Sequence, residues 1–132
     1  MNRILLIDDT PEIAELLTFA LRDQGFEVVA SGFTAAINEL IEDARPAAIV
    51  LDCSVYQMSE SLFDSIRGDA NHSGLPVVII SDTVEKADAS LRSRAAERVL
   101  LLPKPFTASQ VGRALNELLA VTDHARLKGS RS

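Results

Sequence analysis

The sequence ILLIDDTP, at residues 4–11, contains the step from strand to helix on which the fold depends. Its four apolar residues form a run of the length of a buried strand. Two acids follow, and then Thr10 and Pro11, which suit the N-cap and first position of a helix. Apolar residues at helical spacing predict that this helix has a face made of Ile13, Leu16, Leu17, Ala20 and Leu21. The stretch therefore predicts a buried strand that leads directly into a helix.

The same alternation continues along the chain. Further short apolar runs predict strands at residues 26–30, 47–51, 77–80 and 99–102. Segments of helical period follow them at residues 37–44, 62–66, 84–95 and 111–119. Strands that alternate with helices predict a parallel sheet covered on both faces, with right-handed crossovers. We therefore expect a doubly wound α/β fold.

Length and composition limit the class of protein. The chain has 132 residues, of which 47% are hydrophobic and 24% charged, as is usual for one soluble globular domain. We expect that domain at residues 1–121 and a flexible polar tail at residues 122–132. No apolar run approaches the ~18 residues that a membrane helix needs. The N-terminus has no signal-peptide pattern, and the single cysteine, Cys53, cannot form an internal disulfide, so we expect a cytoplasmic protein.

The charge balance argues against one class of partner. The formal net charge is −6. Binding to DNA through phosphate neutralisation requires a basic surface, so we expect no nucleic-acid partner. An acidic domain suits cations or basic partners instead.

Polar residues stand where the predicted strands end: Asp8, Asp9, Asp52, Ser81, Asp82 and Lys104. In doubly wound folds the ligand site lies beyond these strand ends, so we expect the side chains to converge. Carboxylates that lie close together repel one another unless a cation lies among them. Mg²⁺ takes one or two carboxylates and often a phosphate oxygen. Asp8, Asp9 and Asp52 with Mg²⁺ and Lys104 would balance in charge and could hold a phosphoryl group with the Ser81 hydroxyl.

This constellation resembles the receiver domain of two-component response regulators, over about residues 2–121. The matching stretches are ILLIDD at 4–9, IVLD at 49–52, VIIS at 78–81 and KPF at 104–106. The resemblance implies a flavodoxin-like (βα)5 three-layer sandwich with sheet order 2-1-3-4-5. It also implies a phosphoacceptor signalling switch in a two-component or phosphorelay system. Such a protein promotes its own phosphorylation and dephosphorylation and turns over no separate substrate.

The resemblance implies roles for individual residues. Asp52 would accept a phosphoryl group from a histidine kinase or a phosphotransfer protein. The magnesium ion would be bound directly by Asp9, by Asp8 through water, by Asp52, and by the backbone carbonyl of Ser54.

Three further residues would act on the phosphoryl group. The Ser81 hydroxyl and the Lys104 ammonium group would contact it. Pro105, expected in the cis form, would aim the lysine into the site.

Several positions depart from the family pattern. Asp82 stands where a small residue is usual, and we expect it to slow phosphorylation or to speed hydrolysis. Leu101 stands where the family has an aromatic residue that takes part in switching. We hypothesise that Tyr56, which lies next to the site, takes over part of that coupling. The departures leave open an alternative function, a degenerate receiver that binds partners without phosphorylation.

The resemblance also implies how the signal leaves the domain. A tail of this length is too short to fold as an output domain. We therefore expect a stand-alone receiver that binds an unknown downstream protein through residues 84–95, 99–102 and 111–119, as a monomer or as a weak homodimer through that face. His72 and His124 fall in polar segments and are expected to be solvated. Ser81 has an alternative interpretation as the N-cap of the helix that follows it.

Overall fold

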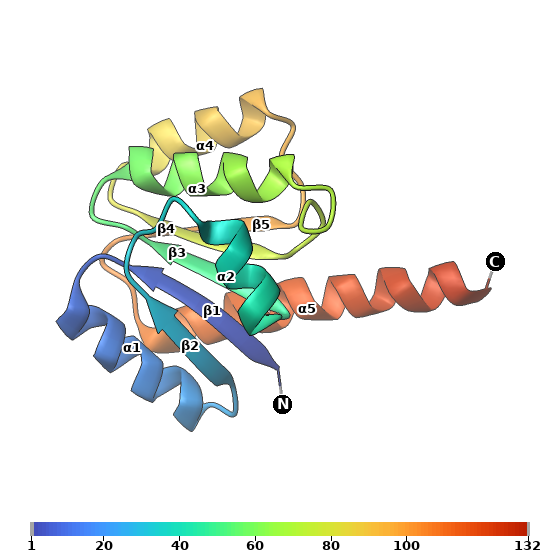
Figure 1. Ribbon diagram of the computed structural model, residues 1–132, viewed down its shortest axis with the longest axis horizontal. Helices are drawn as coiled ribbons and strands as arrows, with labels where there is room; N and C mark the ends of the chain where they lie inside the picture. Colours follow the sequence, from blue (N-terminus) through green and yellow to red (C-terminus); the bar gives the residue numbers. More distant parts are fainter. Residues whose placement is uncertain (1, 132) are drawn as a thin grey trace.

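The computed structural model describes residues 2–131, and the side chains of residues 2–121. Five parallel strands form one sheet in the order β2-β1-β3-β4-β5 (Figure 1). Their bounds are β1 Arg3–Asp8, β2 Glu27–Ser31, β3 Ala48–Asp52, β4 Val77–Ser81 and β5 Val99–Pro103. The predicted fold class and strand order are confirmed.

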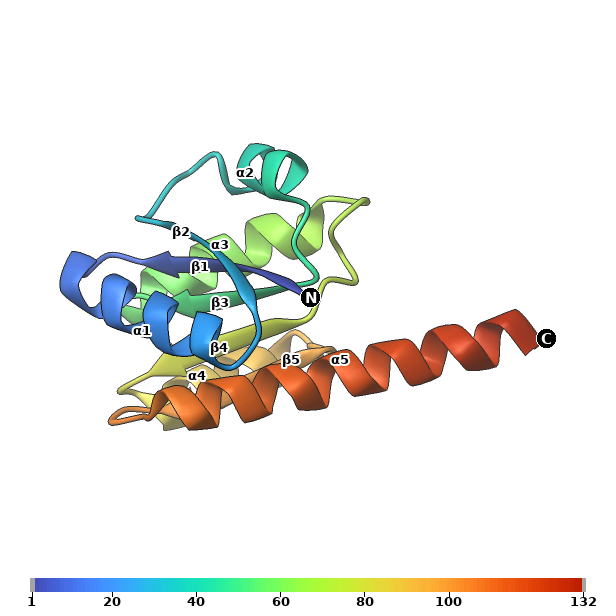
Figure 2. The ribbon, with the colours of Figure 1, turned by 90° about the horizontal axis from the view of Figure 1, so that it is seen from below.

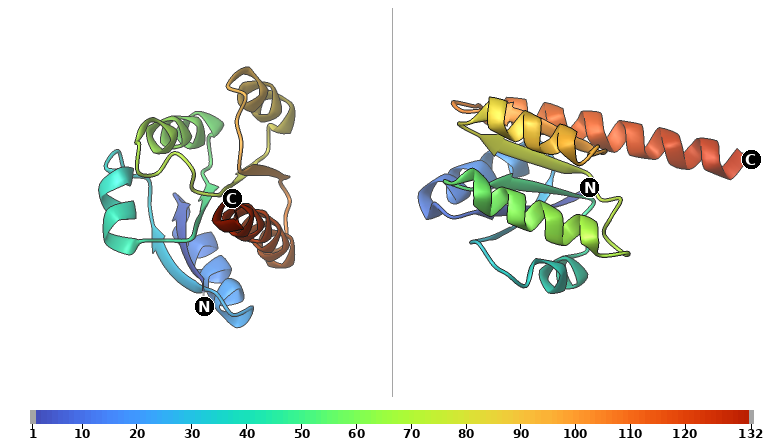
Figure 3. Two further views of the ribbon diagram at one scale, coloured as in Figure 1. Left: turned by 90° about the vertical axis from the view of Figure 1, so that its right-hand side faces the viewer. Right: turned by 90° about the horizontal axis from the view of Figure 1, so that it is seen from above.

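Five helices cover the two faces of the sheet: α1 Pro11–Asp23, α2 Ile37–Ala44, α3 Tyr56–Gly68, α4 Val84–Ser93 and α5 Ala108–Arg131. Helices α1 and α5 pack on one face, and α2, α3 and α4 pack on the other (Figure 3). None of the helices in residues 2–131 has the length and apolar character needed to cross a membrane.

The hydrophobic core lies in two layers, one on each side of the sheet. In β1, Ile4 and Leu6 point to the layer under α1 and α5, whereas Leu5 and Ile7 point to the layer under α2 and α3. Because both faces are covered, the central strands are apolar at successive positions and do not alternate with polar residues. This packing fixes the carboxyl ends of the strands, where the candidate site residues stand.

Several element boundaries differ from those predicted. Helix α3 begins at Tyr56, six residues before the predicted start, because its first turns are largely polar and give no apolar period. Strand β2 lies one residue later than expected, and Phe26 is buried beside it. Helix α5 continues through Arg131 (Figures 1 and 2), so the backbone of the predicted tail is helical, and the flexibility of that tail stays a prediction.

The predicted apolar face of α1 is only partly covered, and one prediction about exposure was wrong. Leu17 and Leu21 of that face are buried, whereas Ile13 and Leu16 are 40% and 72% exposed. His72, expected in solvent, is buried: its Nδ1 contacts the Asn38 amide oxygen at 2.7 Å and its Nε2 contacts Glu42 at 2.8 Å. The side chain of His124 lies outside the described residues.

Candidate functional site

The sheet register brings the predicted site residues to one edge. Asp8 at the end of β1 lies directly beside Asp52 at the end of β3. Ser81 at the end of β4 pairs with Pro103 of β5, and the backbone amide of Lys104 donates to the Ser81 carbonyl at 3.0 Å. Parallel pairing in this order is therefore what assembles the site from four distant segments.

Asp52 is a buried carboxylate with a cationic partner. Its side chain is 3% exposed, and the Lys104 Nζ lies 3.3 Å from its Oδ1. The same ammonium group donates to the Cys53 carbonyl at 3.4 Å. The Lys104–Pro105 peptide bond is cis. A buried anion held against one lysine is suited to act as a nucleophile.

Asp8 is the second buried acid of the site. Its Oδ1 accepts a hydrogen bond from the Thr10 amide at 2.9 Å, whereas its Oδ2 is buried and has no hydrogen-bond partner among the described residues. Burial raises the pKa of Asp8 to about 7, against the lowering effect of the Thr10 amide, and the neighbouring Asp52 and Asp9 add to the rise. The surroundings therefore favour the protonated form of this carboxyl group over the ionised form.

Asp9 is oriented differently from the other two acids. Its carboxylate accepts hydrogen bonds from the Ser54 amide, at 2.8 Å, and from the Ser54 hydroxyl. Partial burial opposes ionisation, but the hydrogen bonds from Ser54 outweigh it and, with the charge of Lys104, lower the pKa of Asp9. Ser54 thus contacts the acid pair through its amide and hydroxyl in the structure, and its predicted carbonyl role stays a prediction.

The donor set fits a hard divalent cation. Among the residues that the structure describes, no three acidic, histidine or cysteine side chains form a ready metal cluster. Mg²⁺, however, needs only one or two carboxylates and keeps several waters. Asp8 and Asp52 are adjacent, and the unpartnered Asp8 Oδ2 is an oxygen of the required kind.

The hydroxyl at the end of β4 has a local partner. Ser81 is 3% exposed, and its Oγ accepts from the Thr83 amide at 3.0 Å and lies 3.2 Å from the Thr83 hydroxyl. Thr83, rather than Ser81, occupies the N-cap position of α4, so the capping interpretation of Ser81 is wrong. Sequence reasoning missed Thr83, although a threonine just before a helix is an N-cap signal. Asp82 is exposed in the same loop.

The two atypical switch positions lie in the core layer under α2, α3 and α4. Tyr56 is the first residue of α3 and packs against that layer half-buried. Leu101 of β5 packs against the same layer. Their shared environment is compatible with coupling, but their predicted roles stay predictions.

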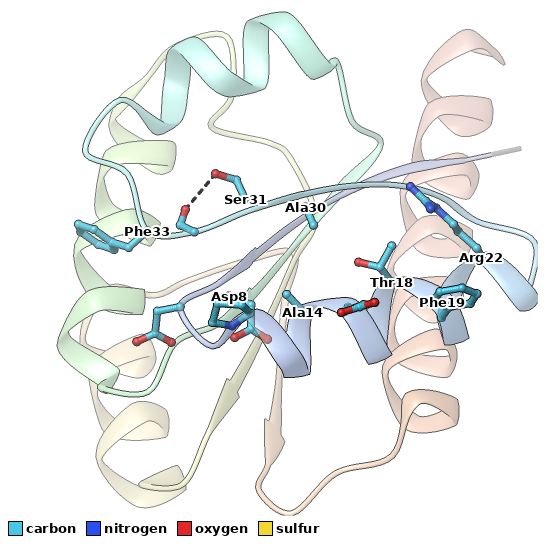
Figure 4. Close-up of a pocket in the computed structure, with 12 residues that line it drawn as sticks. Asp8, Ala14, Thr18, Phe19, Arg22, Ala30, Ser31 and Phe33 are labelled. Atoms are coloured by element: carbon cyan, nitrogen blue, oxygen red, sulfur yellow. Dashed lines mark hydrogen bonds between the residues drawn. The ribbon is translucent and has the colours of Figure 1, made fainter.

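A groove that the sequence did not predict opens beside the acid pair (Figure 4). Its volume is about 650 Å³, and it extends from Asp8 and Asp9 along α1, facing the end of β2. Phe19 and Phe33, which line it, are 72% and 43% exposed. Leu16 is also 72% exposed, so α1 has an apolar outer surface that continues from the groove.

The family model and the curated relatives that match this chain both belong to the response regulators. A family model described as the response regulator receiver domain matches residues 4–116. The DNA-binding response regulator MtrA of Mycolicibacterium smegmatis is 31% identical over 112 residues, which are 83% of this chain and 47% of that protein. The chain spans about half the length of the curated relatives it matches.

Solved structures share the fold. A sensor protein from Polaromonas sp. JS666 is 26% identical, with a TM-score of 0.78 over 90% of this chain and 96% of that one. The receiver domain of the sensor histidine kinase PA1611 from Pseudomonas aeruginosa PAO1 is 23% identical, with a TM-score of 0.75 over 90% of this chain and 98% of that one. The latter structure has a magnesium ion coordinated in its active-site cleft.

Proposed function

This chain belongs to the response regulator receiver domain family, and on that premise we propose that it is a phosphoacceptor switch of a two-component or phosphorelay system. Asp52 accepts a phosphoryl group from a histidine kinase or a phosphotransfer protein. The observation that carries the proposal is the buried Asp52 carboxylate, beside Asp8 and 3.3 Å from the Lys104 ammonium group.

The reaction requires little machinery beyond these groups. A carboxylate oxygen of Asp52 attacks the phosphorus, the bond from phosphorus to the donor nitrogen breaks, and its electron pair stays on the donor imidazole. Lys104 neutralises charge on the transferred group, and the Ser81 hydroxyl donates to one of its oxygens. The product is an acyl phosphate on Asp52.

Asp9, Asp52 and the Ser54 carbonyl would hold Mg²⁺ directly and Asp8 would hold it through water, as the family resemblance implies. When bound, the ion would neutralise negative charge at the phosphoryl oxygens. The buried Asp8 Oδ2 supports this assignment, because a water bound to the ion would give it a hydrogen-bond donor. The magnesium described for the PA1611 receiver domain supports the same choice of metal.

The surface offers two places for protein partners. The groove along α1 adjoins the acid pair, so a protein that delivers a phosphoryl group to Asp52 can dock there. A smaller groove of about 480 Å³ lies between α4 and β5 and supports the α4 and β5 part of the predicted α4–β5–α5 face as the output or homodimer surface. The curated relatives are named as a DNA-binding response regulator and a probable transcriptional regulatory protein. For this chain we propose that the signal passes to a downstream protein through the α4–β5–α5 face. We place the protein in the cytoplasm.

The proposal is tested by incubating the protein with Mg²⁺ and a small-molecule phosphodonor and recording its intact mass. We expect a gain of one phosphoryl group in the wild type and none in Asp52→Asn. Asp43→Asn, which neutralises an exposed acid of α2, is the matched control and should gain the group like the wild type.

A beryllofluoride titration separates the remaining outcomes. Beryllofluoride binding without accumulated phosphate would indicate fast hydrolysis at a functional acceptor site. Neither binding nor phosphate would contradict the proposal and favour a receiver that binds partners without phosphorylation.

A further inference from the structure

Helix α4 is attached to the molecule by few apolar contacts and by one polar cluster. It buries only Ala87 and Leu91. Near its carboxyl end it is joined to its neighbour α3 (Figures 1 and 3) by four side chains from the two helices. We call these residues the α3–α4 clamp: Glu60, Asp64, Ser90 and Arg94.

The clamp is centred on the guanidinium group of Arg94. Its Nε and one Nη donate to the two carboxylate oxygens of Asp64, at 2.7 and 2.9 Å, in a paired geometry that fixes both side chains. The other Nη donates to the Ser90 carbonyl at 3.0 Å. The Ser90 hydroxyl donates to Glu60 at 2.6 Å, and Glu60 lies 3.6 Å from Arg94. The four residues form a closed network instead of one isolated ion pair.

Helix α3 also leads back to the acceptor site. Cys53 is buried in the same apolar layer as Leu62 and Phe63 of α3. Cys53 follows Asp52 in the chain, and its carbonyl accepts a hydrogen bond from Lys104. The segment that joins the acceptor to α3 therefore contacts the same lysine that pairs with Asp52.

The amino end of α4 is linked to the site by a different contact. The Thr83 amide, at the N-cap of α4, donates to the Ser81 hydroxyl oxygen at 3.0 Å. If Ser81 rotated to donate its hydroxyl to a phosphoryl group on Asp52, the oxygen that accepts from the Thr83 amide would move, and the first turn of α4 would be affected. The clamp holds the last turn of the same helix.

We propose that the α3–α4 clamp sets the energetic cost of moving α4 and thereby tunes how tightly the acceptor site holds a phosphoryl group. The inference rests on the proposed phosphoacceptor function of Asp52. The structure contains both the clamp and the ion pair between Lys104 and the unmodified Asp52 carboxylate. The clamp therefore stabilises the unphosphorylated conformation of the domain. By linkage, it weakens the binding of a phosphoryl group that favours a different position of α4.

The exposure of the clamp side chains determines how much the clamp stabilises the position of α4. The side chains of Arg94 and Asp64 are 31% and 51% exposed, so a single pair between them would contribute little. The paired geometry and the links to Ser90 and Glu60 strengthen it. Because α4 has few apolar anchors, a modest change is enough to shift its position.

The test compares Arg94→Ala and Asp64→Asn with the wild type in two measurements. The first is the affinity for beryllofluoride in the presence of Mg²⁺, followed through the fluorescence of Tyr56, which is the only tyrosine in a chain without tryptophan. The second is hydrogen exchange of the α4 amides. Arg92→Ala is the matched control, because Arg92 lies on the same helix but pairs with Asp88 within α4.

We expect both clamp variants to bind beryllofluoride roughly fivefold more tightly than the wild type, with faster exchange in α4. Arg92→Ala should match the wild type in affinity. Faster exchange with unchanged affinity would mean that the clamp is only structural and would overturn the inference. If the wild type itself failed to bind beryllofluoride, the proposed function would fail first, and the coupling with it.

Discussion

At Asp8, burial beside Asp52 creates a titration in the physiological range. The pKa of this carboxyl group is raised from 3.8 to about 7, mainly by burial. A raised folded-state pKa means that the folded chain holds the proton more tightly than the unfolded chain does. The resulting stability is fully present below about pH 3.8 and is lost as the pH rises through about 7.

We therefore predict that the protein without Mg²⁺ loses stability as the pH rises from about 3.8 to about 7, the window between the ordinary pKa of an aspartate and the raised pKa of Asp8. Chemical denaturation at several pH values in the presence of a chelator measures this loss. Asp8→Asn should flatten the profile, because its side chain has no proton to lose. An unchanged slope in Asp8→Asn would place the titration elsewhere.

The affinity for Mg²⁺ should rise with pH, whereas the stability of the metal-free protein falls. A carboxyl group must release its proton before it can bind a metal ion, so the Mg²⁺ affinity should rise as the pH approaches about 7 and level off above it. Calorimetry in buffers of different ionisation enthalpy measures the released proton. Equal affinity at pH values well below and well above the Asp8 pKa would contradict this prediction.

Asp82 is predicted to shorten the life of the phosphorylated form. It is exposed in the loop that follows Ser81, and its charge acts near the dianionic phosphoryl group. Removing one such charge changes the barrier by about 1 kcal/mol, so Asp82→Asn should slow dephosphorylation roughly fivefold. The decay of the phosphorylated mass after donor removal measures this, with Asp88→Asn on α4 as the control. Identical decay rates in Asp82→Asn and the wild type would exclude the role.

At the scale of elements, His72 joins α2 to the segment between α3 and β4. Its two ring nitrogens face Asn38 and Glu42, and the Asn38 amide group donates to the Ser65 carbonyl of α3 at 2.9 Å. His72→Ala removes a buried imidazole together with its contacts to Asn38 and Glu42 and should lower the free energy of unfolding by about 1–3 kcal/mol. Glu42→Gln changes an exposed partner of the ring and should lower the free energy of unfolding by less. Urea denaturation of both variants measures the two losses. A negligible loss in His72→Ala would mean that α2 is held by its apolar face alone.

The element boundaries show what a local pattern can and cannot predict. The strand from Ile4 to Ile7 and the fold class could be predicted because apolar runs and helical periods are local signals. The early start of α3 at Tyr56 could not, since its first turns carry no apolar period. The burial of His72 depends on Asn38, thirty-four positions away, and no local signal reports it.

The candidate site was predictable to a similar extent. Asp8, Asp52, Ser81 and Lys104 each follow a recognisable strand, and the topology alone brings them to one edge. The hydrogen bonds between Asp9 and Ser54 could not be predicted, because they depend on side-chain orientation after the chain has packed. The groove along α1 was missed for a related reason: helical spacing identifies an apolar face, but not how much of that face the sheet covers.

At the scale of the whole molecule, the groove predicts how a protein donor reaches Asp52. Leu16 and Phe19 are each 72% exposed on α1, and Phe19 lines the groove that begins at the acid pair. Leu16→Ala combined with Phe19→Ala should slow phosphotransfer from a protein donor roughly tenfold or more, as loss of interface anchors does. Phosphorylation by a small molecule should be unchanged.

A control for the groove is Val121→Ala, which trims an exposed apolar residue of α5. It should leave both reactions at wild-type rates. If the double α1 variant slowed the small-molecule reaction as well, the damage would lie in the site and not in docking.

The central claim is that Asp52, among the acids at this edge, is the residue that carries the phosphoryl group. Borohydride reduction of the phosphorylated protein, followed by peptide mass spectrometry, locates the acyl phosphate directly, because the reduced residue differs in mass from aspartate. We predict a reduced residue at Asp52 in the wild type and none in the Asp52→Asn variant. A reduced residue at Asp8, Asp9 or Asp82 instead would contradict the assignment of the acceptor.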